Sequence, residues 1–243
     1  MDHRGVRELA ARQHGLATRA QIVALGGSDR LIARQVATGR WTRARRGVVV
    51  VGAAPATWEQ RVMAAVLAAG PGAVASNRTG LRVWGLVPLS GRLEVLLGGS
   101  RVAVVPGVVV HRTRDLPARD IAQHQGVPVT SVARTLVDAS AGQDARVVAS
   151  WVDDATRRLG LDLVDLQECL NRRSGPGHPS LAHLRASVAA RLPLAGQGES
   201  PLEVRALLAL ARAGLPAPVV QHRVALPDGT VALLDLAYPA KQV

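Results

Sequence analysis

Apolar residues recur every three to four positions in three short segments at the start of the chain, residues 4–14, 18–25 and 29–38. This spacing predicts three short helices, each with one apolar face. Glycines follow each segment, where they favour the end of a helix. The pattern then changes to a basic extended segment and a run of valines, residues 41–44 and 47–52, which predicts a hairpin.

Polar residues mark the starts of the second and third predicted helices. Thr18 stands at the N-cap position of the second helix, and Gln21 three residues later completes the pattern of a capping box. Ser28 caps the third helix, which carries the acidic residue Asp29 in its first turn, where the helix dipole favours negative charge. Both helix starts are therefore predicted by local chemistry as well as by spacing.

The third predicted helix carries a polar stripe, Arg30, Arg34 and Thr38, opposite the apolar residues Ile32 and Val36. Three short helices followed by a hairpin is the order of a winged helix-turn-helix, whose third helix enters the major groove of DNA. Arginines at these positions would read guanine edges or hold phosphates, and the alternative is a solvated face. The residues expected to bind DNA are Thr18, Gln21, Arg30, Arg34, Thr38, Arg43, Arg45 and Arg46, the last three on the wing.

The middle of the chain alternates between helical and strand-like patterns and predicts a mixed α/β domain. Arg134 and Asp138 lie four residues apart on a predicted helix, as a local ion pair worth about 0.3 kcal/mol. His111, Arg112 and Arg114 at a strand end would contact phosphate, although an exposed strand face is the favoured interpretation. We expect helices at residues 57–69, 79–84, 131–140 and 150–159, and strands at 73–76, 93–97, 102–105 and 108–113.

Turn-forming residues at 171–180 break this pattern, and a short helix at 181–190 and a loop at 192–198 follow. The last 45 residues predict a helix at 200–213, capped by Ser200, and a hairpin that turns at Asp228-Gly229. The patterns together predict an α+β multidomain protein. Its expected domains are residues 1–52, 53–170, 171–198 and 199–243.

The charge of the chain is concentrated at its start. The formal net charge is +12 over 243 residues, and the first 52 residues hold ten arginines and three acidic residues. A charge needed only for solubility would be spread evenly, so this concentration favours a polyanionic partner, most simply nucleic acid. Aromatic residues make up only 2%, which argues against stacking platforms for single strands.

Composition also excludes several classes of protein. The single cysteine, Cys169, excludes an internal disulfide and a cysteine-cluster metal site, and the histidines show no metal-ligand spacing. No segment reaches the ~18 uncharged apolar residues of a membrane span. The first residues lack the apolar core of a signal peptide, so we expect a cytoplasmic protein.

The segment from Leu9 to Gly52 resembles the N-terminal domain of AbiEi-type antitoxins, the winged-helix regulators of type IV abortive-infection toxin–antitoxin systems. The resemblance rests on the helix pair, on the helix Arg30–Gly39 and on the R-x-R-R-G-V wing at Arg43–Val48. Residues 76–86 and 108–138 resemble the region that follows in the same family. The resemblance implies a regulator that binds its promoter and represses its own operon, with a nucleotidyltransferase-like toxin as its partner.

Residues 199–239 resemble the start of nuclease-fold domains related to very-short-patch-repair endonucleases, of the PD-(D/E)xK superfamily. In that pattern Glu203, Gln221 and Asp235 occupy the first three places, and the resemblance implies that Asp235 would hold a Mg²⁺ ion. One carboxylate cannot fix this ion, and the acidic strand that supplies the second would follow Val243. An incomplete endonuclease-like helix and hairpin is therefore expected, with activity only if the gene extends past Val243, and the alternative is a plain hairpin packed on a helix.

The favoured function is that of a sequence-specific DNA-binding regulator of the AbiEi type, without a cofactor. The alternative is a metal-dependent DNA endonuclease of the very-short-patch-repair class, which needs Mg²⁺. A third possibility is an RNA-directed or structural basic protein. The expected partners of the regulator are double-stranded DNA, a nucleotidyltransferase-like toxin and a second copy of the chain in a homodimer, with no membrane.

Overall fold

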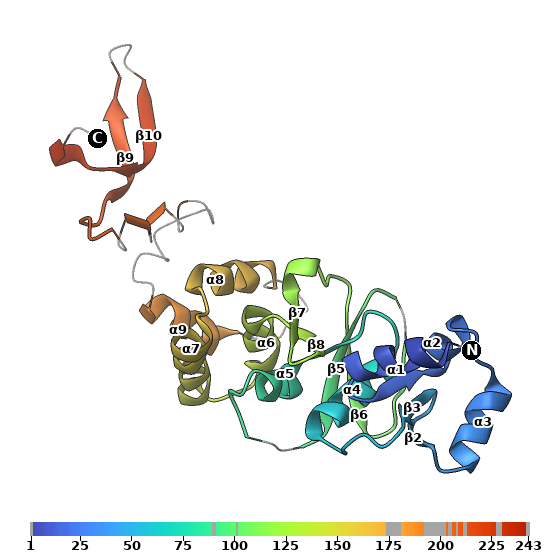
Figure 1. The fold of residues 1–243 in the computed structure, drawn as a ribbon. Helices are drawn as coiled ribbons and strands as arrows, with labels where there is room; N and C mark the ends of the chain where they lie inside the picture. The colour runs from blue at the N-terminus through green and yellow to red at the C-terminus, as the bar shows by residue number, and fades with distance from the viewer. Residues whose placement is uncertain are drawn as a thin grey trace. The chain divides into compact units, whose positions relative to one another are not determined.

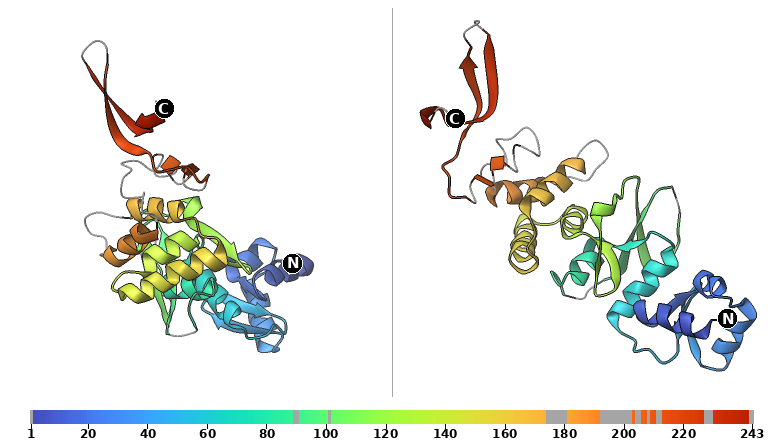
Figure 2. Two further views of the ribbon diagram at one scale, coloured as in Figure 1. Left: turned by 90° about the vertical axis from the view of Figure 1, so that its left-hand side faces the viewer. Right: turned by 45° about the horizontal axis from the view of Figure 1, so that its top comes forward.

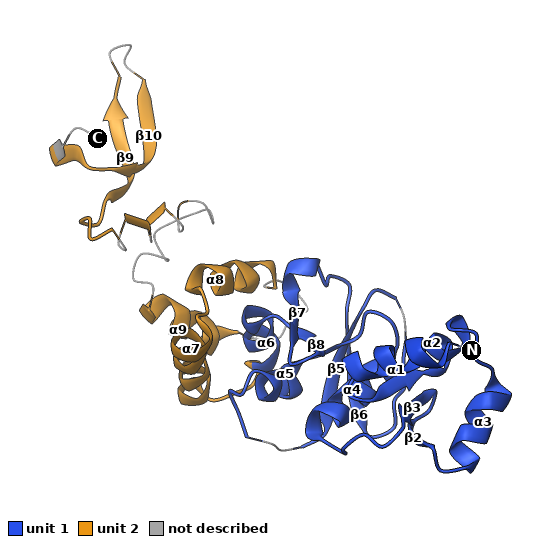
Figure 3. Ribbon diagram, viewed as in Figure 1, with its two compact units in different colours: residues 1–139 blue, residues 140–243 orange. Residues whose placement is uncertain are grey.

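The computed structural model describes residues 2–88, 91–100, 102–173, 181–191, 203, 206–207, 209–210, 213–226 and 230–241. Within these ranges the chain is a mixed α+β structure with separate sheets of three, five and two strands. It divides into two compact units, residues 1–139 and 140–243 (Figure 3). The finer division at residues 52, 170 and 198 stays a prediction.

The first unit begins with residues 2–52, here called the head, which contain three helices and a three-stranded antiparallel sheet (Figure 1). The helices lie where the sequence predicts them, at α1 (His3–Arg12), α2 (Arg19–Ala24) and α3 (Asp29–Ala37). The sheet has the order β1-β3-β2, with β1 (Leu16–Thr18), β2 (Trp41–Arg45) and β3 (Val48–Val51). Strands β2 and β3 form the predicted hairpin, whereas β1 is too short to leave a periodic pattern in the sequence.

The rest of the first unit is built on a five-stranded mixed sheet of order β6-β5-β4-β8-β7. Its β5–β6 and β4–β8 pairs are parallel, and its β4–β5 and β7–β8 pairs are antiparallel. Helices α5 (Asn77–Val83) and α6 (Val132–Ala139) approach closely at Gly80, where an added Cβ would lie 2.9 Å from Thr135 Cγ2. The strands are β4 (Val74–Ala75), β5 (Leu93–Gly98), β6 (Val108–Thr113), β7 (Ile121–His124) and β8 (Val127–Thr130), and a 3₁₀ turn (Ala118–Asp120) precedes β7.

Helix α4 (Trp58–Ala69) lies between the two sheets of the first unit (Figure 2). On one side, Val62 packs into the core of the five-stranded sheet. On the other side, Met63 packs with Leu16 and Val48 of the head. Two hydrophobic cores therefore share one helix, which explains why the head and the five-stranded sheet form a single compact unit.

One predicted strand of the middle region is wrong, and one predicted ion pair is confirmed in a different environment. Residues 102–105 do not form a strand, and Val102 and Val104 are 73% and 90% exposed in the connection between β5 and β6. Their β-branched composition suits a strand, but no neighbouring strand pairs with them. Arg134 and Asp138 do form an ion pair, but it is not a surface pair, because Arg134 is fully buried and also contacts Asp120.

Among the described residues up to 191, the second unit contains three helices, and a two-stranded antiparallel hairpin and a 3₁₀ turn (Pro239–Lys241) follow further along the chain. Helix α7 (Ala145–Leu159) begins earlier than predicted, and α8 (Leu163–Arg172) was not predicted. Three elements lie where expected, namely α9 (Ala182–Arg191), β9 (Val219–Ala225) and β10 (Val231–Ala237). The predicted break at 171–180 begins too early, because α8 continues to Arg172, and residues 174–180 of it lie outside the described residues. The loop at 192–198, the cap at Ser200, most of the helix at 200–213 and the turn at Asp228-Gly229 also lie outside them.

Throughout the ranges given above, no helix combines the length and the apolar character that crossing a bilayer requires.

Candidate nucleic-acid interface

The predicted caps fix the starts of α2 and α3. The Thr18 hydroxyl accepts a hydrogen bond from the Gln21 backbone N–H at 3.1 Å, and the Gln21 side-chain oxygen accepts one from the Thr18 backbone N–H at 2.8 Å. The Ser28 hydroxyl accepts from the Leu31 backbone N–H at 3.3 Å. These bonds satisfy donors that a helix leaves unpaired at its start, so they define where α2 and α3 begin.

The structure uses the side chains of Thr18 and Gln21 inside the head. Besides the capping box, Gln21 and Gln13 exchange two amide hydrogen bonds of 2.9 and 3.2 Å. Gln13 is buried and also donates to the Leu16 carbonyl at 3.1 Å. These contacts join α1, α2 and β1, and a contact of Thr18 or Gln21 with DNA stays a prediction.

Helix α3 presents its predicted polar stripe to solvent. Arg30, Arg34 and Thr38 are exposed, whereas Ile32 is buried against Trp41 in the core of the head. Within the described part of the chain, the guanidinium groups of Arg30 and Arg34 have no hydrogen-bond or ion-pair partner. Two unpaired positive charges therefore stand one helical turn apart on the same face of α3.

The three arginines of the β2–β3 hairpin differ in their surroundings. Arg43 and Arg46 are exposed, but Arg45 is half-buried, and its Nη1 donates to the Pro106 carbonyl at 2.8 Å. Burial, together with repulsion from Arg61, lowers the pKa of Arg45 from its ordinary value. Arg45 thus anchors the hairpin to the connection that precedes β6, while Arg43 and Arg46 face solvent.

An ion pair that the sequence analysis missed joins α2 to α3. Arg19 Nε and Nη2 donate to the two carboxylate oxygens of Asp29 at 2.5 and 2.6 Å. The hydrogen bond from Arg19 lowers the pKa of Asp29, so the carboxylate stays ionised. The two residues also line a hollow of about 330 Å³ between α3 and the hairpin. Their separation of ten residues matches no helical spacing, so the sequence carries no signal for this pair.

The five-stranded sheet holds the other basic residues named from the sequence. His111 Nε2 lies 2.7 Å from Glu94 Oε2 on the neighbouring strand β5, so its partner is a carboxylate of the chain itself. Arg112 and Arg114 are exposed. This arrangement is an exposed strand end with one side-chain contact to a neighbouring strand, as the favoured interpretation expects.

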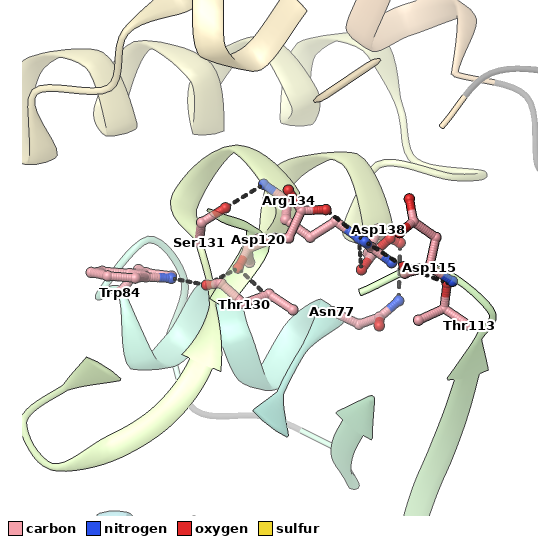
Figure 4. A network of polar contacts seen from close by, with 10 residues as sticks. Asn77, Trp84, Thr113, Asp115, Asp120, Thr130, Ser131, Arg134 and Asp138 are labelled. Carbon is pink, nitrogen blue, oxygen red and sulfur yellow. Dashed lines mark hydrogen bonds and ion pairs between the residues drawn. The ribbon is translucent and has the colours of Figure 1, made fainter. Parts of the chain in front are cut away.

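Figure 4 shows the polar network around the buried Arg134. Its Nε donates to Asp138 Oδ2 and its Nη1 to Asp120 Oδ2, both at 2.8 Å, and Nη1 also lies 3.3 Å from the Asp115 carbonyl. Burial opposes the charged form, but the two carboxylates outweigh it and raise the pKa of Arg134. The network ties α6 to the segment that leads into β7, which is a structural role.

The residues of the predicted nuclease motif lie in the second unit. Gln221 is on β9 and Asp235 is exposed on β10, and the register of the hairpin places them at the same level. Glu203 is described, although the residues on either side of it are not. Among the described residues, no group of three or more His, Cys, Asp or Glu side chains is arranged to hold a metal ion. The Mg²⁺ site and the nuclease-like fold stay predictions.

The head thus combines three helices, the third of which exposes a basic stripe, with a small sheet whose hairpin carries further arginines. This arrangement is compatible with a winged helix-turn-helix. Residues 6–52 match the family described as "Transcriptional regulator, AbiEi antitoxin", and this confirms the resemblance of the head to that family. The match does not extend to the C-terminal segment.

Comparison with solved structures finds a similarity to the RV2827C protein from Mycobacterium tuberculosis. The two chains are 16% identical with a TM-score of 0.49, and the similarity covers 92% of this chain and 87% of the other. No curated protein sequence matches the chain.

Proposed function

We propose that the chain is a sequence-specific DNA-binding regulator of the AbiEi antitoxin type. The observation that carries this proposal is the exposed pair Arg30 and Arg34, which stands unpaired among the described residues on the third helix of a segment that matches this family. Free guanidinium groups on a protruding helix suit phosphate oxygens and guanine edges, because arginine presents its donors as a planar fork. The net charge of +7 on residues 1–52 attracts the duplex from a distance.

In this proposal the head binds DNA as a winged helix-turn-helix. Helix α3 lies in the major groove, with Arg30, Arg34 and Thr38 toward the bases and phosphates. Arg43 and Arg46 of the hairpin contact the adjacent backbone. Arg45 supports the hairpin through its bond to the Pro106 carbonyl and is not itself one of the exposed contacts.

Binding to its own duplex is the first test. Fluorescence anisotropy of the full chain would compare duplex DNA from the region upstream of its gene with a scrambled duplex and with single strands of the same sequence. We expect the upstream duplex to bind most tightly, with affinity falling as salt rises. Equal affinity for the upstream and scrambled duplexes, or a preference for single strands, contradicts the proposal.

The proposal includes repression of its own operon and a nucleotidyltransferase-like toxin as partner, as the AbiEi family suggests. A reporter driven by the upstream region should be repressed by the wild-type chain and released by a variant in which Arg30 and Arg34 are alanine. Co-expression with such a toxin from the same operon should restore growth that the toxin alone arrests. Unchanged reporter output, or unrelieved arrest, contradicts the respective part of the proposal.

A further inference from the structure

A cavity of about 780 Å³ opens on the face of the head sheet opposite α3. Successive side chains of β2 point to opposite faces. Trp41 therefore packs into the core beneath α3 and Arg43 lines the hollow beside that helix, whereas Thr42 and Ala44 line the cavity. Its volume lies within the range of about 300–1,000 Å³ that is typical of small-molecule sites. Arg45 lines both this cavity and the hollow beside α3, whereas the α3 residues that the proposed function assigns to DNA line neither.

Three arginines line this cavity, and none of the described residues that line it is acidic. Arg40 follows α3, Arg45 ends β2 and Arg61 lies in the first turns of α4. Arg40 and Arg61 are exposed, and within the described ranges neither has an ion-pair partner. Burial and, after it, repulsion from Arg61 lower the pKa of Arg45, as expected for two positive charges that line one cavity. An anion between them would remove this repulsion.

Most of the remaining wall of the cavity is small and apolar, and Thr42 and Gln60 are its neutral polar residues. It includes Ala44 of β2 and Ala53, Ala54 and Ala56 of the segment that leads to α4. Short side chains leave room for a ligand that is larger than a single ion. An anionic group held by arginines, with an apolar or planar body against alanines, is the ligand chemistry that this lining suits.

We propose that this cavity binds a small phosphorylated molecule, of which a mononucleotide is an example, with its phosphate between Arg40, Arg45 and Arg61. Phosphate is the anion that matches several convergent arginines, because each guanidinium can donate two parallel hydrogen bonds to it. The site does not depend on the proposed function, since its ligand binds without DNA. A failure to bind DNA would therefore leave this proposal standing.

Isothermal titration of the full chain with AMP and with inorganic pyrophosphate tests the proposal. We expect both probes to bind the wild type. Arg61→Ala should weaken both at least tenfold by removing a charge, and Ala44→Leu should weaken AMP at least tenfold by filling the cavity. Arg119→Ala, which removes an exposed arginine elsewhere in the first unit, should leave both affinities unchanged. Circular dichroism would confirm that each variant folds, and Arg61 is exposed, so its replacement leaves the core intact.

The same variants show whether the probes bind in the cavity or elsewhere on the chain. If the wild type binds neither probe, or if Arg61→Ala and Arg119→Ala weaken binding equally, there is no site in the cavity and the proposal is overturned. Titration of the same variants with duplex DNA tests whether the cavity holds a phosphate of DNA. If Arg61→Ala and Ala44→Leu weaken duplex binding while neither probe binds, the cavity holds a DNA phosphate and the proposal is likewise overturned.

Discussion

Replacing Arg30 and Arg34 together by alanine separates DNA binding from folding more cleanly than any other change in the head. Both side chains are exposed and have no partner within the described residues, so their removal leaves no buried group unsatisfied. Like charges four residues apart on a helix repel by about 0.2–0.5 kcal/mol, and alanine has the best helix propensity. The double variant should therefore be as stable as the wild type or slightly more stable.

The expected effect on DNA binding follows from the number of exposed arginines. Arg30, Arg34, Arg43 and Arg46 are the exposed candidates for contact with the duplex. Each phosphate contact contributes about 0.9 to the slope of log K against log salt, so four contacts give a slope of about −3.6. Removing two of them should reduce the slope to about −1.8. If the two arginines instead read guanines, each loss is worth about 1–3 kcal/mol, and specificity for the upstream duplex falls as well.

Anisotropy measured between about 50 and 200 mM salt distinguishes these outcomes. The matched control replaces Arg119 and Arg146, which are also exposed, and so removes the same charge from elsewhere on the chain. We expect the control to keep the wild-type slope and the wild-type preference for its own duplex. Equal losses in the two double variants would refute the reasoning, because binding would then depend on net charge and not on α3.

Three further predictions concern contacts within the first unit and within the second unit. Thr18→Ala removes a capping box and should lower the free energy of unfolding by about 1 kcal/mol in urea titrations, with the DNA affinity at fixed salt unchanged; a lower affinity of the folded variant would show instead that Thr18 contacts DNA. Arg134→Met leaves Asp120 buried without its cation and should destabilise the first unit by about 3–5 kcal/mol, and a loss below 1 kcal/mol would contradict the buried network. In the second unit, the hydrogen bond from Arg191 lowers the pKa of Asp153. The stabilisation from this ion pair should be present above about pH 4 and lost as the pH falls through the lowered pKa. In Arg191→Ala, the Asp153 pKa measured by NMR titration should rise toward its ordinary value, and an unchanged pKa would contradict the contact.

Local chemistry made the helices of the head predictable. Thr18 with Gln21, and Ser28 at the start of α3, supply hydrogen bonds within three residues, and such bonds can be inferred from the sequence alone. The β7–β8 hairpin was missed for the opposite reason. Its two turn residues, Gln125 and Gly126, have positive φ angles of 48° and 77°, and glutamine is not a residue that signals such a turn.

Long-range contacts explain the remaining differences. The spacing of Arg134 and Asp138 predicts a pair on one helix, but only the fold brings Asp120 to the same guanidinium and buries Arg134 and Asp120. Likewise, the sequence places Arg45 beside Arg43 and Arg46 as an equal member of the wing. Its bond to Pro106, which lies far along the chain, gives it a different environment that no local pattern contains.

The contacts of the head with the five-stranded sheet bear on how this protein would be regulated. Helix α4 belongs to both cores, His14 Nε2 lies 2.9 Å from the Gln125 carbonyl, and Arg45 reaches the Pro106 carbonyl at 2.8 Å. A head held at three places cannot reorient as a free domain without breaking packed contacts. The β2–β3 hairpin takes part in two of these contacts, through Val48, which packs with Met63 of α4, and through Arg45, which lies beside the proposed phosphate cavity. We therefore expect a ligand in that cavity to act on DNA affinity through the hairpin, because recruiting Arg45 to a phosphate competes with its bond to Pro106.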